Sequence, residues 1–424
     1  MQTEIDPVLR KLTITGFKSI RNAEIELGRV NMFIGGNGSG KSNILEALGL
    51  LSASLKDISE AELQKRGVRL SLPTLFKSSF KNFSIRPHFV LKADFDASVQ
   101  YDVSIKSGEQ FDSLRFFTEN IRYGRKSYMG RGQNGITVRG LTPNKKDIDP
   151  TRGLWDRFRE AIDLPPALEA ELGPMARFAI YAPQTAFLRG TDVEAVPVRP
   201  IGLQGGGLPL AAEAVRMARR RIGKWEKRGL YGRVLDLVNA PGWNDGFTVT
   251  KFISELVPAQ VRTGDATLYF LDKFMKRGRN TLSAYDSSEG TLYLLFMAVM
   301  ILHPDAPKIF ALDNVDNALN PAMTRRMLET LIESTCGTEF RDAGIGPEQV
   351  FLTSHNPTAL DAFDLFDPDQ RVFVVSRKPE TGETVISPLR PKVGWSKEDW
   401  IKAWAGRTLS ELWIEGKITG ALGE

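Results

Sequence analysis

Residues 35–42, Gly-Gly-Asn-Gly-Ser-Gly-Lys-Ser, fit the phosphate-binding pattern G-x-x-x-x-G-K-[ST] at every fixed position. This loop constrains the fold most strongly, because the pattern is meaningful only between a strand and a helix. The apolar run Val30–Ile34 predicts a buried strand before it, and Ser42–Leu48 has apolar residues at helical spacing after it. Backbone N–H groups of such a loop converge on phosphate oxygens at the positive end of a helix. The sequence therefore predicts an α/β P-loop core.

The P-loop residues predict a site for ATP and Mg²⁺. We expect Lys41 to reach the β- and γ-phosphates and Ser42 to bind Mg²⁺. The residues expected to surround the phosphates are Gly35, Asn37, Gly38, Ser39, Gly40, Lys41, Ser42 and Asn43.

Composition disfavours several other classes of protein. No apolar run approaches the ~20 residues that a membrane helix needs, so we expect no membrane association. The polar and acidic start, Met1–Asp6, is unlike a signal peptide. A single cysteine, Cys336, excludes an intramolecular disulfide and a cysteine-rich zinc site, and a reducing cytoplasm is the expected location. A net charge of +5 permits contact with nucleic acid without requiring it.

Two alternating segments, Leu12–Ile20 and Ala23–Leu27, predict strands that lead into the P-loop strand. The pattern Leu-x-Ile-x-x-Phe-Lys-Ser-Ile before GGNGSGKSN resembles the ATPase heads of the RecF, Rad50 and SMC group within the ABC-type class. This resemblance implies that a basic residue of the opening turn lies near the nucleotide. Lys18 and Arg21 are the matching positions, and two solvated surface charges are the alternative.

The middle of the chain predicts a sheet followed by a helical lobe. Residues 88–95, 100–105 and 114–122 alternate in polarity, which favours an antiparallel sheet. Residues 124–140 are rich in Gly and Arg, and we expect a solvated turn region or a mobile basic loop there. Residues 211–238 have helical periodicity and form the most basic stretch, which is either a solvated helix face or a contact for DNA or an acidic partner. No sustained heptad pattern follows, so we expect no long coiled-coil arms.

A second informative stretch, Ser287-Ser288-Glu289-Gly290-Thr291-Leu292, opens an apolar helix that runs to Leu302. It resembles the signature motif of the same ATPase group, which is a second phosphate-binding helix start. In that group the motif acts on the ATP held by the opposite subunit. The resemblance therefore assigns Ser288, Glu289 and Gly290 to nucleotide contact across a homodimer, whereas an ordinary helix N-cap is the alternative.

The remaining motifs follow predicted strands in the order that the group requires. Lys308–Asp313 resembles the Walker B strand, whose carboxylate orients Mg²⁺ and its water shell. Ala318–Pro321 resembles the D-loop, which crosses the dimer interface. The strand from Gln349 ends at His355, the position of the switch histidine that senses the γ-phosphate. Gln184 matches the glutamine that contacts Mg²⁺ and the attacking water.

Asn314 departs from the pattern of the group, which has a glutamate after the Walker B aspartate to deprotonate the attacking water. An amide cannot act as a general base. Asp316 is a possible substitute base, but we favour slow hydrolysis in which ATP binding itself is the signal. The expected catalytic set is Asp313, Asn314, Asp316 and His355.

Together the motifs predict an α/β P-loop NTPase of ABC-type head architecture. It would have a mixed core sheet flanked by helices, an antiparallel β subdomain and a helical lobe carrying the signature. We expect an N-terminal ATPase lobe over residues 1–184, a helical and β insert over 185–285, and a C-terminal ATPase lobe over 286–424. The ending Arg407–Gly416 resembles short bacterial AAA-family ATPases related to the overcoming-lysogenization-defect group.

Many ATPases of that last group serve in phage defence beside a separate effector protein. The resemblance thus implies an ATP-dependent homodimer, or a higher assembly of dimers, that switches an effector. A RecF-like DNA-repair ATPase that binds DNA directly is the alternative. A self-contained nuclease is disfavoured, because only a short tail follows His355, and Asp367 and Asp369 alone make no metal centre.

Overall fold

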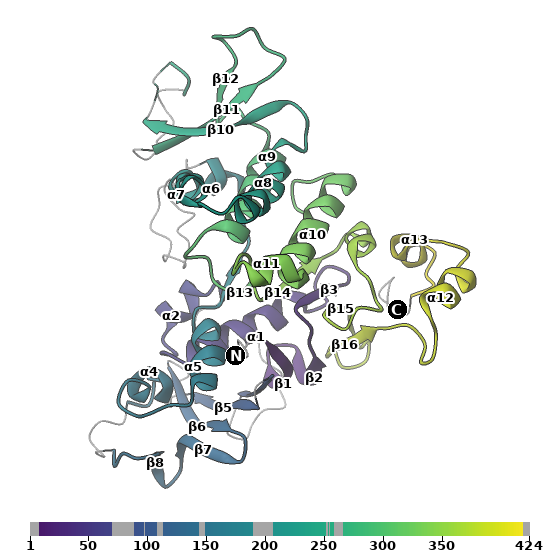
Figure 1. Cartoon of the computed structure of the whole chain (residues 1–424). Coiled ribbons are helices and arrows are strands. Elements are labelled where there is room, and N and C mark those ends of the chain that lie inside the picture. Colours follow the sequence, from purple (N-terminus) through teal and green to yellow (C-terminus); the bar gives the residue numbers. More distant parts are fainter. Residues whose placement is uncertain are drawn as a thin grey trace. The chain divides into compact units, whose positions relative to one another are not determined.

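The computed structural model describes residues 8–69, 89–96, 98–107, 113–143, 149–189, 207–251, 253, 255–257 and 266–418, and the chain forms two compact units (Figure 1). The first unit comprises Met1–Ile180, Lys308–Asn314 and Glu348–Glu424. The second comprises Tyr181–Pro307 and Val315–Pro347. Each unit is therefore assembled from segments that lie far apart in the sequence.

The P-loop strand lies in a six-stranded mixed sheet with the order β16-β15-β3-β14-β13-β9. The strands β13, β14, β3 and β15 are parallel neighbours, and β16 pairs antiparallel with β15 to form a terminal hairpin. Every residue of β3 is buried, as expected for a parallel strand covered on both faces. The bounds are β3 Val30–Ile34, β9 Ala179–Tyr181, β13 Ile309–Leu312, β14 Gln349–Ser354, β15 Gln370–Arg377 and β16 Thr384–Leu389. Because parallel strands end at one edge, the P-loop, Asp313 and His355 all leave the sheet there.

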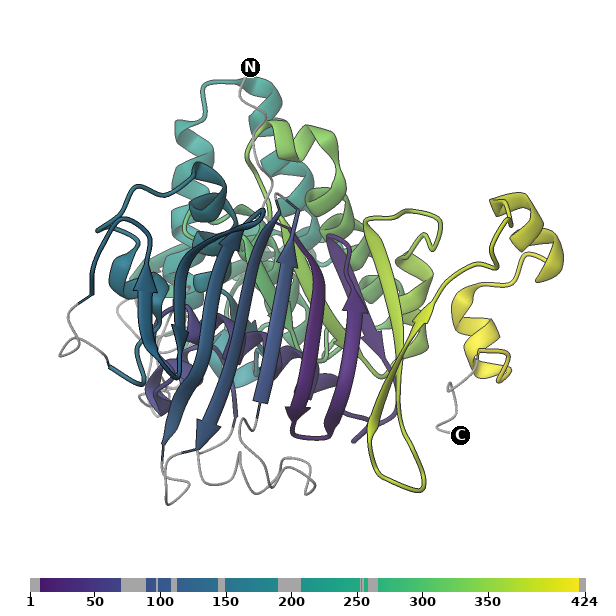
Figure 2. The same cartoon turned by 90° about the horizontal axis from the view of Figure 1, so that it is seen from below.

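A second sheet of the first unit has seven antiparallel strands in the order β2-β1-β4-β5-β6-β7-β8, which Figure 2 shows side by side. Alternate residues of β4 are buried, so one face of this sheet belongs to the core. The predicted antiparallel subdomain is thereby confirmed. The bounds are β1 Leu9–Phe17, β2 Ile20–Glu26, β4 Phe89–Phe95, β5 Val99–Ser107, β6 Leu114–Tyr123, β7 Lys126–Gly132 and β8 Gly135–Val138.

Strands β7 and β8 show that the expectation of turns or a mobile loop over residues 124–140 was wrong. β7 pairs antiparallel with both β6 and β8. Its Arg131 guanidinium lies 4.6 Å from the centroid of the Phe116 ring. Gly130, Gly132 and Gly135 carry no side chains, so the alternation of polarity that marks a strand is weak here, and pairing with β6 decides the structure instead.

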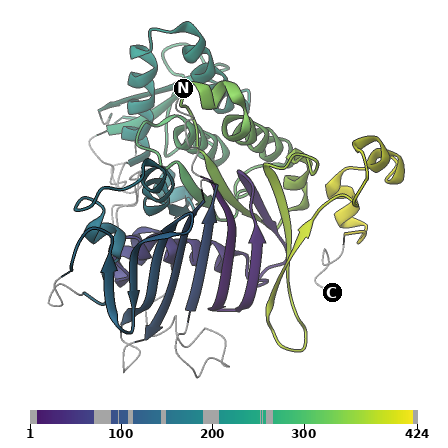
Figure 3. The same ribbon diagram turned by 60° about the horizontal axis from the view of Figure 1, so that its bottom comes forward.

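Helix α1, Lys41–Ser54, begins directly after the P-loop and is buried at every residue from Ile44 onward. The core of the first unit contains Leu48 of α1 together with Leu91 of the antiparallel sheet and Phe33 of the mixed sheet. A helix enclosed on all sides has no polar face, which explains its continuous apolar run. Since each fully buried Leu stabilises the fold by roughly 1.5–3 kcal/mol, this packing fixes the helix start that faces the P-loop. Figure 3 shows the antiparallel strands and the β15–β16 hairpin beside them.

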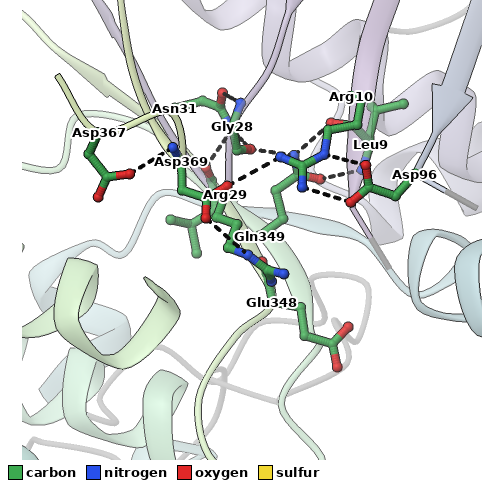
Figure 4. A network of polar contacts seen from close by, with 11 residues as sticks. Leu9, Arg10, Gly28, Arg29, Asn31, Asp96, Glu348, Gln349, Asp367 and Asp369 are labelled. Carbon is green, nitrogen blue, oxygen red and sulfur yellow. Dashed lines mark hydrogen bonds and ion pairs between the residues drawn. The ribbon is translucent and has the colours of Figure 1, made fainter. Parts of the chain in front are cut away.

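A polar network joins the starts of several strands, at the edge of the mixed sheet opposite the P-loop (Figure 4). The buried Gln349 side chain donates to the carbonyls of Leu9 at 2.8 Å and Gly28 at 2.6 Å, and it accepts from the Leu9 amide at 3.0 Å. Arg10 forms ion pairs with Asp96 at 2.6 Å and Asp369 at 3.2 Å. The network satisfies buried polar groups and fixes the relative register of β1, β3, β14 and β15.

The second unit combines a small antiparallel sheet with a buried helix. Its strands are β10 Asn244–Lys251, β11 Ala266–Asp272 and β12 Thr281–Ser283. Its helices are α6 Thr185–Arg189, α7 Gly207–Arg221, α8 Trp225–Asn239, α9 Glu289–Leu302, α10 Pro321–Cys336 and α11 Thr338–Asp342. Every residue of α9 from Thr291 to Leu302 is buried, so this helix forms the core of the unit. The single helical stretch expected over 211–238 is interrupted at residues 222–224, where Gly223 favours a break.

The described residues of the first unit form six further short helices. They are α2 Glu60–Lys65, α4 Leu154–Phe158, α5 Pro166–Ala176, η2 Pro357–Ala362, α12 Lys397–Ala403 and α13 Leu409–Ile414. The terminal pair begins at two capping boxes, formed by Ser396 with Asp399 and by Thr408 with Glu411. In the part of the chain that the structure describes, no helix has the length and apolarity needed to span a membrane.

Candidate functional site

The P-loop closes over its own lysine. Lys41 Nζ donates to the carbonyl oxygens of Gly35 at 2.7 Å and Gly36 at 2.8 Å. Gly40 has a φ of 108°, and a Cβ at this position would lie 2.2 Å from Thr384 Oγ1. Only glycine meets both requirements, since its backbone is left-handed and a neighbouring side chain occupies the space.

Ser42, Asp313 and Thr353 form a hydrogen-bonded group where β13 and β14 end and α1 begins. Ser42 Oγ lies 3.0 Å from each carboxylate oxygen of Asp313. Thr353 Oγ1 donates to Asp313 Oδ1 at 2.6 Å. Asp313 is only 5% exposed, so its charge sits in a largely enclosed place where a neighbouring cation stabilises it.

These residues fit a nucleotide phosphate with its magnesium ion. The Ser39 hydroxyl is buried and has no hydrogen-bond partner among the described residues, so it can donate to a phosphate oxygen. Lys41 is 7% exposed and supplies a positive charge at the start of α1. Ser42 and Asp313 supply the hard oxygen atoms that Mg²⁺ prefers.

The opening turn between β1 and β2 lies against the P-loop. Lys18 adopts a left-handed φ of 51° and forms a buried ion pair with Glu46 of α1. Ser19 Oγ accepts from Asn43 Nδ2 at 2.6 Å and lies 2.7 Å from Thr384 Oγ1. Burial, together with the nearby Arg69 charge, lowers the pKa of Lys18 to about 7. Lys18 thus lies buried beside the loop, and its contact with the nucleotide stays a prediction.

Arg21, the other basic candidate of the opening turn, is more exposed. Its side chain is 56% exposed and forms an ion pair with Glu383 at 2.8 Å. Glu383 comes directly before β16, so Arg21 joins the opening turn to the terminal hairpin. The two basic candidates therefore have different surroundings: Lys18 contacts α1, and Arg21 contacts the terminal hairpin.

The terminal hairpin supplies P-loop contacts that sequence reasoning missed. Thr384 Oγ1 donates to the Ser39 carbonyl at 3.0 Å. Arg377 donates to the Gly38 carbonyl at 2.9 Å and to the Gly382 carbonyl at 2.6 Å. No motif marks these two residues, since their contact depends on β15 and β16 pairing beside β3. Their contacts hold the outer part of the loop in place.

Asn314 and His355 follow the strand ends as expected from the sequence. Asn314 adopts a left-handed φ of 58°, and its backbone N–H donates to Thr353 Oγ1 at 2.9 Å. Asparagine tolerates this conformation better than most residues with a side chain, which is a backbone reason for its presence after Asp313. His355 is exposed directly after β14.

In the second unit, the signature residues lie at the start of α9. Ser288 is exposed at the N-cap, and its side chain makes no capping hydrogen bond there. Glu289 accepts a hydrogen bond from Thr185. A Cβ on Gly290 would lie 3.0 Å from the Ala318 carbonyl oxygen, so the D-loop packs closely against the signature. This helix start presents an exposed serine with unused hydrogen-bonding capacity.

Asp316 and Gln184 also belong to the second unit. Asp316 is 8% exposed, and its charge adds to burial in raising the pKa of the Tyr293 hydroxyl of α9. Gln184 is exposed and directly precedes α6. The roles of both residues toward Mg²⁺ and water stay predictions.

Two family models match separate stretches of the chain. A model described as "AAA domain, putative AbiEii toxin, Type IV TA system" matches residues 182–361, and one described as "AAA ATPase domain" matches residues 8–125. Both stretches are similar to AAA ATPase domains. The two matched stretches include the P-loop, Asp313, the signature and His355.

Among solved structures, the chain is similar to the SMC head domain from Thermotoga maritima. The identity is 16% and the TM-score is 0.37, with 90% of this chain and 99% of that chain covered. No curated protein gives a significant match.

Proposed function

We propose that this chain is an ABC-type ATPase of the cytoplasm that binds ATP with Mg²⁺ and dimerises around two nucleotides. The observation that carries the proposal is the contact of Ser42 with Asp313 at 3.0 Å, beside Lys41 at a helix start. The similarity of both matched stretches to AAA ATPase domains supports the same nucleotide chemistry.

The residues of the first unit act mainly by binding and neutralising charge. Lys41 Nζ exchanges the carbonyls of Gly35 and Gly36 for phosphate oxygens, and Ser42 with Asp313 holds the metal. A Mg²⁺ ion held by Ser42 and Asp313 would supply positive charge that neutralises the phosphates. His355 and Gln184 are proposed to face the γ-phosphate and the attacking water, respectively.

The signature helix of the second unit acts across the dimer. Ser288 is exposed and makes no capping bond, and Glu289 and Gly290 follow it at the helix start. Such a start is suited to the γ-phosphate of a nucleotide bound by another copy, because its N–H groups point toward the anion. ATP therefore joins two chains, and dimers can build larger assemblies.

Hydrolysis is proposed to be slow, so that ATP occupancy is the signal. Asn314 has no basic group, and its left-handed backbone favours Asn over Glu. A slowly reversed dimer suits a switch for a separate effector protein. One matched model is named for a toxin of a Type IV toxin–antitoxin system, which supports a role in bacterial antiphage defence.

Direct binding of DNA is the second candidate function. It is favoured by the exposed cations Arg220, Arg221, Lys224 and Arg228 around the α7–α8 turn, where Trp225 is 80% exposed. Arg216 of the same stretch is paired with Glu213 at 2.7 Å and contributes less. A repair ATPase of RecF type would use such a surface directly.

Molar mass measured by light scattering, with and without MgATP, tests the switch. A mass that doubles only with ATP supports it, and a constant mass in both states contradicts it. Fluorescence anisotropy with labelled duplex DNA addresses the second candidate. Binding that a charge reversal at Arg220 and Arg221 abolishes, and that needs no effector, would favour the repair function.

A further inference from the structure

The guanidinium of Arg69 joins two carboxylates at the nucleotide site. Arg69 Nε donates to Glu46 at 3.1 Å, and Arg69 Nη2 lies 3.0 Å from Asp313 Oδ2. Both carboxylates are almost fully buried, with side chains only 4% exposed. The Arg69 side chain itself is 57% exposed, so the cation reaches inward from solvent. No sequence motif pointed to this residue.

Asp313 uses both of its oxygens in this arrangement. Oδ1 accepts from Thr353 at 2.6 Å and lies 3.0 Å from Ser42 Oγ. Oδ2 lies 3.0 Å from both Ser42 Oγ and Arg69 Nη2. The carboxylate proposed to orient Mg²⁺ and its waters is therefore already satisfied by a protein cation and two hydroxyl groups.

We propose that Arg69 is the counter-ion of Asp313 in the nucleotide-free site and that Mg²⁺ must displace it. The inference rests on the proposed binding of MgATP. A divalent ion beside Ser42 and Asp313 repels a guanidinium 3.0 Å from the same carboxylate, because like charges at this distance disfavour each other. Arg69 thereby opposes the metal and sets how much Mg²⁺ is needed for ATP to bind.

Glu46 gives the displaced guanidinium a second partner. It is buried on α1 and is shared between Lys18 and Arg69. When Arg69 leaves Asp313, its contact with Glu46 keeps the positive charge within the first unit. Because the side chain is more than half exposed, solvent also stabilises the displaced cation, and its movement requires no rearrangement of the core.

The change Arg69→Gln is expected to have opposite effects on ATP binding in the presence and in the absence of Mg²⁺. With Mg²⁺ present, loss of the competing cation lowers the magnesium concentration for half-maximal ATP binding by about 2–5-fold, the range expected for a partly exposed ion pair. In EDTA, ATP binds more weakly to the variant than to the wild type, because the Asp313 charge is no longer neutralised. The opposite signs of the two effects distinguish competition from a general loss of structure.

Isothermal titration of ATP, in EDTA and over a series of Mg²⁺ concentrations, measures both effects. Arg122→Gln is the matched control, because Arg122 is also a partly exposed arginine paired with a carboxylate, Asp102, in the same unit. Both variants are checked by circular dichroism and thermal melting. Arg69→Lys, which keeps the charge with a shorter reach to Asp313, is expected to lie between wild type and Arg69→Gln.

Three results overturn the inference. Weaker ATP binding by Arg69→Gln in saturating Mg²⁺ would mean that Arg69 contacts the nucleotide instead. Equal behaviour of Arg69→Gln and wild type under both conditions would mean that the Asp313 contact has no role in metal binding. If wild type binds no ATP with or without Mg²⁺, the proposed function fails and this inference fails with it. If wild type binds ATP but Arg69→Gln does not behave as expected, only the role of Arg69 is contradicted.

Discussion

Ser42 Oγ lies 3.0 Å from both carboxylate oxygens of Asp313, although 271 positions separate the two residues in the chain. Strand β14 lies between β3, which leads into the P-loop, and β13, which ends just before Asp313, and its own Thr353 contacts the same carboxylate. The nucleotide site therefore depends on the register of three parallel strands. A substitution at one of the three residues should alter the position of the other two and weaken ATP binding.

Thr353→Val tests this dependence. The substitution keeps the shape of the side chain but removes the hydroxyl that contacts Asp313 and the Asn314 amide. A hydrogen bond to a charged group is worth about 1.5–3 kcal/mol, so we expect ATP affinity in Mg²⁺ to fall by about tenfold or more. Thr250→Val, at an exposed position of β10, is the control. Unchanged titration curves for Thr353→Val would show that Asp313 needs no orientation by β14.

Ser288→Arg tests the role of the signature in dimerisation. Ser288 is exposed and makes no capping bond within α9, so the variant should fold and bind ATP normally. A long charged side chain at the helix start would block the approach of another copy. We expect the ATP-dependent increase in molar mass to disappear, and persistent dimerisation with ATP would place the interface elsewhere. Gly290 is a poorer test, because even a Cβ there crowds the Ala318 carbonyl at 3.0 Å.

Substitutions of Asn314 test why hydrolysis should be slow. A positioned general base typically contributes ~10²–10⁴-fold, so Asn314→Glu should raise the turnover of ATP. Its left-handed φ of 58° disfavours Glu, and Asn314→Asp serves as the conformationally matched variant. Phosphate release is the measurement. If neither carboxylate raises the rate, the water is not held beside residue 314.

Asp316→Ala distinguishes two explanations for the lack of a glutamate after Asp313. Either hydrolysis is slow and ATP binding is the signal, or Asp316 acts as the base instead. If ATP binding is the signal, wild-type turnover is already close to background and this change alters it little. If Asp316 is the substitute base, the change abolishes a measurable wild-type rate. A brisk wild-type rate that survives Asp316→Ala would defeat both readings.

Glu119, which lies outside the nucleotide motifs, should make the free energy of unfolding depend on pH. Burial raises the pKa of Glu119 to about 7, against the opposing effect of Arg131. Because the folded-state pKa lies above the ordinary value of 4.5, the stabilising contribution of the protonated form is complete below about pH 4.5 and is lost as the pH rises through about 7. At about 1.4 kcal/mol per pKa unit, the loss is on the order of 3–4 kcal/mol.

Denaturant unfolding of wild type and Glu119→Gln between pH 5 and 8 checks this contribution. The difference in unfolding free energy between the two proteins should change with pH in favour of the variant, because Gln carries no proton to lose. Parallel pH profiles would show that Glu119 stays ionised in the folded protein.

The sequence predicted the parts of the site that consist of local motifs. The P-loop, the strand before it and the strands ending at Asp313 and His355 each combine an apolar run with a polar end, which is a local signal. The antiparallel subdomain was predicted over β4, β5 and β6 for the same reason. Its continuation into β7 and β8 was missed, because the glycines there weaken the alternation and pairing with β6 decides the structure.

The contacts that complete the site could not be predicted from the sequence. Thr384 and Arg377 reach the P-loop only because the last hairpin pairs beside β3, and Arg69 reaches Asp313 only through the folded first unit. Each is an ordinary surface residue type with no fixed spacing to a motif. Their contacts depend on the pairing of segments that lie far apart in the chain, and no local sequence pattern predicts that pairing.

The affinity of the chain for ATP, measured by isothermal titration with Mg²⁺ for wild type and Lys41→Ala, tests the central claim most directly. Lys41 supplies the main positive charge facing the phosphates, so we predict clear binding by the wild type and loss of binding by the variant. Lys56→Ala removes a lysine that is 49% exposed and paired with Glu62, and it should bind as the wild type does. Equal ATP affinity in Lys41→Ala and wild type would contradict the account.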